Sequence, residues 1–84
     1  MIRKSNRHSK FDKSVAEFAK KYPSITEAVL GLAWSLERDP KLGIRIQEID
    51  VWRVRLRLED SSQFLIYYSF DSKTVRLLTI ALAD

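Results

Sequence analysis

The sequence predicts a single α+β domain in which a two-helix hairpin packs on an antiparallel sheet of three to four strands. In the first half of the chain, apolar residues recur at the spacing of an α-helix, and in the second half they recur at every other position, as in a β-strand. The two patterns follow one another without βαβ alternation, which favours α+β over α/β architecture. With 84 residues, the chain suffices for one domain, residues 1–84, with a thin, two-layered core.

The first helix is predicted over residues 11–22. Its apolar side chains recur at intervals that place them on one helix face: Phe11, Val15, Phe18, Ala19 and Tyr22. Pro23 interrupts this helix, because proline has no N–H to donate and its ring clashes with the preceding turn.

A second helix is predicted directly after Pro23. Ser24 and Glu27 have the spacing of a capping box, which marks a helix N-terminus. The apolar stripe that follows consists of Ile25, Ala28, Val29, Leu32, Ala33 and Leu36. Asp39-Pro40 and Gly43 end the helix. Because the connection between the two helices is so short, we expect them to form an antiparallel hairpin.

Three strands are predicted in the second half. Residues 52–58 alternate apolar side chains with Arg53, Arg55 and Arg57, as expected of a strand with one face on the core and one in solvent. Residues 64–70 are rich in aromatic and β-branched types and predict a central strand. Residues 74–82 predict a last strand whose only charge is Arg76. Turn residues at 59–62 and 71–73 join these strands into a meander, and residues 2–7 carry a weak pattern for a fourth.

The row of arginines is the sharpest chemical feature of the sequence. Side chains at i, i+2 and i+4 of a strand project from one face at intervals of about 7 Å, close to the spacing of phosphates along an extended nucleic acid strand. Guanidinium groups bind phosphate with two hydrogen bonds, and the net charge of +4 agrees with an anionic partner. The alternative is a solvated face that Glu48, Asp50 or Glu59 neutralises.

Tyr67, Tyr68 and His8 are the other candidates. Because Tyr67 and Tyr68 are adjacent, they point to opposite faces of their strand. One belongs to the core, and the other either shares the arginine face, where it could stack on a base, or is structural. His8, the only histidine, is either a general acid or base or a bystander near the N-terminus.

Several other chemistries have no support in the sequence. With no cysteine and one histidine, a disulfide framework is excluded and a zinc site is not expected. Gly31 and Gly43 are the only glycines, so there is no glycine-rich phosphate loop. We therefore expect no cofactor and no metal. No apolar run approaches about 18 residues and no secretory signal is present, so we expect no membrane partner and a cytoplasmic location.

The chain resembles the RelE/ParE superfamily of type II toxins. The segments that carry the resemblance, over roughly residues 11–82, are FDKSVAEFAKKYPSITEAV, LERDPKLG, VWRVRLRL, FLIYYSF and TVRLLTIAL. The resemblance implies a toxin that a cognate antitoxin protein covers. RelE-type members cleave mRNA on the ribosome, whereas ParE-type members inhibit DNA gyrase.

The resemblance also implies roles for particular residues. Arg53 and Arg55 follow an aromatic residue, Trp52, as two basic residues do in RelE-like nucleases, and Tyr67 ends the matching Leu-Ile-Tyr run of the next strand. By this resemblance Arg53, Arg55 and Tyr67 are the expected catalytic residues. The expected RNA-binding residues are Arg45, Arg53, Arg55, Arg57 and Arg76.

The sequence departs from RelE-like enzymes in two places. Phe64 stands where those enzymes have a catalytic arginine, and residues 81–84 contain none of the Arg, His or Tyr that active relatives carry after the last strand. Guanidinium groups stabilise charge but do not supply a base. Three interpretations stay open: a RelE-like toxin that binds mRNA and cleaves it weakly, a ParE-like inhibitor of gyrase, and a degenerate homologue that only binds an antitoxin.

Overall fold

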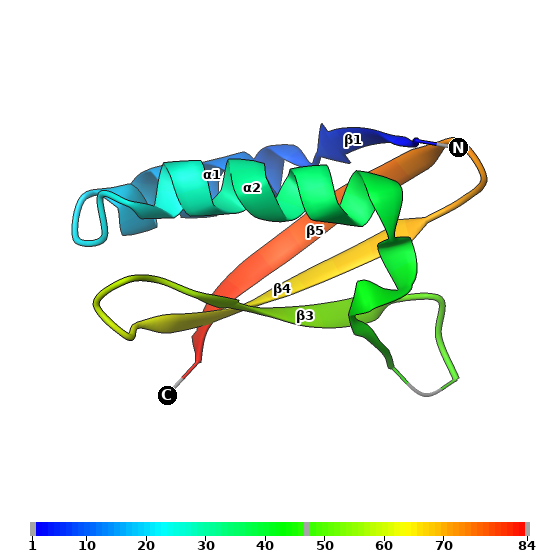
Figure 1. Cartoon of the computed structure of the whole chain (residues 1–84). Coiled ribbons are helices and arrows are strands. Elements are labelled where there is room, and N and C mark those ends of the chain that lie inside the picture. The colour runs from blue at the N-terminus through cyan, green and yellow to red at the C-terminus, as the bar shows by residue number, and fades with distance from the viewer. Residues whose placement is uncertain (1, 47, 84) are drawn as a thin grey trace.

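Two helices cover one face of a five-stranded sheet in the computed structural model, which describes residues 2–46 and 48–83 (Figure 1). The elements in chain order are β1 (Lys4–Arg7), α1 (Ser9–Ala19), α2 (Ile25–Arg38), the short 3₁₀ helix η1 (Pro40–Leu42), β2 (Ile44–Arg45), β3 (Trp52–Arg57), β4 (Gln63–Phe70) and β5 (Thr74–Ala83). The predicted α+β class is confirmed. No helix in the described residues is long and apolar enough to cross a membrane.

The strands lie in the order β1-β5-β4-β3-β2, so β4 is central, as predicted. Strands β2 to β5 pair antiparallel, but β1 runs parallel to β5. The sheet therefore has more strands than the three to four predicted, and it is mixed rather than purely antiparallel. β1 consists of polar residues held by backbone hydrogen bonds at an edge, and β2 has only two residues, so neither shows a clear hydrophobic period.

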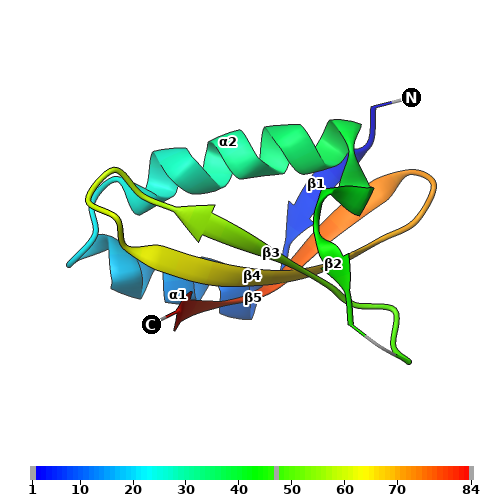
Figure 2. The ribbon, with the colours of Figure 1, turned by 60° about the horizontal axis from the view of Figure 1, so that its bottom comes forward.

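The core lies between the helices and the sheet. Its fully buried side chains come from both layers: Phe11, Ile25, Val29 and Leu36 from the helices, and Phe64, Ile66, Tyr68, Val75 and Leu77 from the strands. Among the described residues, no helix lies on the opposite face of the sheet, and in Figure 2 the strands β4 and β5 pass in front of α1. We call this uncovered side of the sheet the open face.

The helix boundaries differ from the predicted ones because of local capping. α1 begins at Ser9, since the Nδ1 atom of His8 accepts a hydrogen bond from the Lys10 N–H at 3.1 Å. α2 begins at Ile25 as predicted, but the Ser24 side chain makes no capping hydrogen bond. Ser24 already has helical dihedral angles, φ −77° and ψ −4°, so the predicted capping box does not form.

A one-residue irregularity lies between β4 and β5. Tyr67 pairs with Thr79, whereas Tyr68 pairs with Leu77, so Leu78 between them has no partner in β4. Such a bulge re-aims the side chains on either side of it. It places Arg76 and Thr79, three residues apart, on the same face of the sheet.

The Tyr68 hydroxyl fixes the corner between α2 and β2. It donates a hydrogen bond to the Pro40 carbonyl oxygen at 2.7 Å and accepts one from the Gly43 N–H at 3.0 Å. Burial raises the pKa of Tyr68 above its ordinary value, against the opposing effect of the Gly43 hydrogen bond. A Cβ atom at Gly43 would lie 2.5 Å from the Arg53 carbonyl oxygen. Only glycine lets the backbone approach β3 this closely.

Alanine substitution at the two glycines of the chain should change the free energy of unfolding in opposite directions. Gly43→Ala forces β2 away from β3 and should destabilise the protein by more than about 1 kcal/mol. Gly31→Ala is the matched control, because its added Cβ meets nothing within 4 Å and alanine favours a helix by about 0.5–1 kcal/mol over glycine. Urea unfolding at low protein concentration measures both, and equal effects would contradict the assigned close approach.

Candidate nucleic-acid interface

The open face is built from three parallel rows of paired residues on β3, β4 and β5. Each residue of a cross-strand pair projects from the same side of the sheet. The rows, read from β3 to β5, are Arg53–Tyr67–Thr79, Arg55–Leu65–Ala81 and Arg57–Gln63–Ala83. β2 adds Ile44, which pairs with Arg53 and is 68% exposed.

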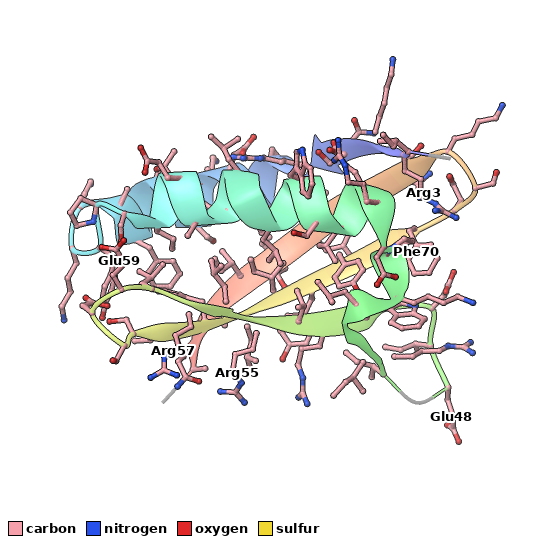
Figure 3. The ribbon with its side chains drawn as sticks, viewed as in Figure 1. Arg3, Glu48, Arg55, Arg57, Glu59 and Phe70 are labelled. Atoms are coloured by element: carbon pink, nitrogen blue, oxygen red, sulfur yellow. The ribbon has the colours of Figure 1, made fainter. Side chains whose placement is uncertain are left out.

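The arginine row, which runs along β3 and takes one member from each of these three paired rows, has the geometry that the sequence predicts. Arg53, Arg55 and Arg57 are exposed, whereas the alternating Val54 and Leu56 are half-buried and buried beneath the helices. Figure 3 shows Arg55 and Arg57 projecting from β3 on the side away from the helices. The three side chains therefore present their charges to the same solvent-facing surface.

The row has no carboxylate partner among residues 2–46 and 48–83. The ion pairs found there involve Arg7, Lys20, Arg38 and Arg76, not the row. Glu48 and Glu59 lie beyond opposite ends of β3 (Figure 3). The described residues therefore do not form the alternative that the sequence left open, in which carboxylates neutralise the arginine row. The charge of the row is available to an anion.

One hydrogen bond organises the end of the row. The Arg55 Nη1 atom donates to the Gln63 Oε1 atom at 2.6 Å, which directs the amide nitrogen of Gln63 away from the arginine. An open pocket of about 470 Å³ begins here and is lined by Tyr22, Arg55, Ser61, Ser62, Gln63, Leu82 and Ala83. Sequence reasoning missed Gln63 and Leu65, although counting back from Tyr67 in steps of two finds both.

Tyr67 and Tyr68 lie on opposite faces of β4, as predicted. Tyr68 is fully buried and holds the corner described above. Tyr67 is half-buried on the open face, between Arg53 and Thr79. Among the side chains of the three paired rows, the Tyr67 ring is therefore the one aromatic group that could stack on a ligand beside the arginines of β3.

Two of the five predicted RNA-binding arginines lie apart from the row. Arg45 pairs with Trp52, so its side chain leaves β2 on the side opposite to Arg53, where its Nε atom donates to the Ile49 carbonyl oxygen at 3.4 Å. Arg76 is on the open face but lies toward β1, and its Nη2 atom is 3.0 Å from the Asp71 carboxylate. The structure therefore groups Arg53, Arg55 and Arg57 and not the other two.

Groups that could transfer protons are sparse on this surface. His8 caps α1 next to β1, at the edge of the sheet away from β3. Phe64 is fully buried and makes edge contacts with the rings of Phe18 and Tyr22, so this position faces the core. The three paired rows hold no carboxylate or imidazole. No group of three or more His, Cys, Asp and Glu side chains that could hold a metal ion occurs in the described ranges.

The hydrogen bonds that the Asp71 carboxylate accepts make an acid-dependent contribution to stability. Hydrogen bonds from the Lys73 and Thr74 N–H groups, and then Arg76, lower the pKa of Asp71 below its ordinary value. A depressed folded pKa means stability that is present above the unfolded value of about 4 and lost as the pH falls through the folded pKa. Asp71→Asn should therefore be less stable than wild type at pH 6, and the difference should shrink below about pH 4. Urea unfolding across pH 2–7 tests this, and a pH-independent difference would contradict it.

Comparisons with protein-family models, with curated proteins and with solved structures find no match to this chain.

Proposed function

We propose that this protein is a RelE-like toxin that binds mRNA at the ribosome through the open face of its sheet and so inhibits translation. The observation that carries the proposal is the row of three exposed guanidinium groups, which has no carboxylate partner in the described part of the chain. The resemblance to RelE/ParE toxins supplies the biological setting. A cognate antitoxin protein is the partner expected to cover this face.

The geometry of the open face suits a single strand better than a duplex. The arginines repeat at about 7 Å along β3, so consecutive phosphates of an extended strand can each meet one guanidinium group. Tyr67 and Leu65 lie beside the row on β4, where they offer flat or apolar contact for unstacked bases. Charge and stacking together favour single-stranded RNA over a rigid helix, because bases in a duplex are not free to stack on the protein.

Any cleavage by this face should be weak. Arg53 and Arg55 could neutralise charge on the reacting phosphate, and Tyr67 could donate a proton. The paired rows supply no carboxylate or imidazole to act as the base. Because a positioned acid or base typically contributes about 10²–10⁴-fold, we propose that binding rather than cutting is the principal activity.

A protein target is the second candidate, and one observation favours it. Ile44 is 68% exposed and pairs with Arg53, and Leu82, 41% exposed, lines the pocket that Arg55 also lines, so apolar surface adjoins the basic row. A ParE-like toxin that acts on gyrase, or a degenerate homologue that binds only its antitoxin, would use such a mixed surface for protein contact.

The double variant Arg53→Ala/Arg55→Ala should weaken binding to a single-stranded oligoribonucleotide and reduce its salt dependence. Each lost phosphate contact removes roughly 0.7 from the slope of log K against log salt, so the slope should fall by about 1.4. Lys10→Ala/Lys13→Ala is the control, because it removes the same charge from exposed positions of α1, in the helical layer. An equal fall in slope in both variants would mean that net charge alone explains the effect, and it would reject the arginine row as the binding site.

Expression in bacterial cells separates the proposed target from the alternatives. A RelE-like toxin should stop translation, and Arg53→Ala/Arg55→Ala should relieve the arrest. If weak cleavage contributes, mRNA should be cut on ribosomes and Tyr67→Phe should reduce the cutting while leaving RNA affinity within about twofold. A DNA-damage response without translation arrest would support the gyrase alternative, and normal growth would support the degenerate homologue.

A further inference from the structure

The outward face of α2 carries an exposed stripe that no part of residues 2–46 and 48–83 covers. Leu30 is 56% exposed and Trp34 is 58% exposed. The core stripe of the same helix (Ile25, Val29, Ala33 and Leu36) lies on its opposite side. At 100° per residue, Glu27, Gly31, Trp34 and Arg38 fall within about 60° of one another around the helix. The stripe therefore runs straight along the surface, with an acid at one end and a base at the other.

Trp34 is held in place within this stripe. The Arg38 guanidinium carbon lies 3.6 Å from the centre of the Trp34 ring, and the Arg38 Nη1 atom donates to the Trp34 carbonyl oxygen at 2.9 Å. These contacts order a large aromatic side chain that is still more than half exposed. An ordered aromatic group loses less conformational entropy when a partner covers it.

We propose that this face of α2 binds α2 of a second copy of the chain in antiparallel orientation, around a two-fold axis next to residues 32 and 33. In that register, residues whose numbers add to 65 lie at the same height. Glu27 then faces Arg38 of the second copy, and Trp34 faces its Gly31. The same two contacts occur twice, as an isologous interface requires. Opposite charges meet at both ends of the helix pair.

Gly31 gives the register its shape complementarity. A Cβ atom there would have no neighbour within 4 Å, so the backbone lies open at the middle of the stripe. The Trp34 indole of the second copy can rest on this open backbone, flanked by Leu30. Small residues at a helix crossing allow the axes to approach toward the lower end of the 8–10 Å range.

This surface is separate from the open face, and the inference does not depend on the proposed function. α2 lies in the helical layer, so pairing through its outer side leaves both arginine rows uncovered and directed away from each other. Because α2 has 14 residues, the interface is shorter than that of a standard stable complex. We therefore expect a weak dimer, with a dissociation constant of about 10–500 μM.

Charge reversal tests the register. Glu27→Arg alone places two like charges at each end of the pair, and so does Arg38→Glu alone, so each variant should be monomeric in sedimentation equilibrium. An equimolar mixture of the two should form a heterodimer, because every end contact again joins opposite charges. Lys13→Glu matches the charge change of Arg38→Glu on the exposed side of α1, and it should dimerise like wild type.

Gly31→Leu separates an interface role from a structural one. Leucine favours the helix over glycine, so the variant should unfold at a higher urea concentration and yet lose at least about tenfold in dimer affinity, equivalent to 1.4 kcal/mol. Circular dichroism confirms that each variant is folded. A wild-type chain that stays monomeric up to about 1 mM, a limit that corresponds to about −4 kcal/mol, or a mixture that fails to associate, would overturn the proposal.

Discussion

Burial of only one face of the sheet is the constraint on which the rest of this structure depends. α1 and α2 both lie on the same side, so each residue of β3, β4 and β5 faces either the core or solvent, according to its position along the strand. A slip of one residue would exchange the two sets. The core therefore fixes the register, and the register fixes which arginines share a surface. Tyr67 and Tyr68 illustrate the point, since one is half-buried on the open face and the other is fully buried.

Much of this arrangement could be predicted from the sequence, because most of the elements have a strong hydrophobic period. The period of two in residues 52–58 identified both β3 and its arginine row, and the aromatic run of residues 64–70 identified the central strand. β1 and β2 were harder to predict. β1 pairs with β5 through its backbone, and its polar side chains leave no period to detect, while two residues of β2 are too few for any pattern.

The candidate site could be predicted less completely than the fold. Arg53, Arg55 and Arg57 were grouped correctly by alternation within one strand. Arg45 and Arg76 were not, because their relation to the row depends on pairing between strands and on the partner Asp71, which sequence spacing alone does not reveal. Similarly, position 64 looked like a lost catalytic residue, yet its side chain packs among Phe18 and Tyr22 in the core.

The unpaired residue Leu78 has a consequence for how this chain can vary in length. Deleting Leu78 would remove the bulge but leave Leu77 opposite Tyr68 and Thr79 opposite Tyr67, so Ile80, now 6% exposed, would stay in the core. A residue inserted between Thr79 and Ile80 would instead shift residues 80–83 by one position relative to β4 and turn Ile80 out of the core, whereas a residue added to the turn at 59–62 would lengthen a loop at little cost. Tolerance to insertion should therefore change abruptly between that turn and the last strand, over fewer than about 20 residues.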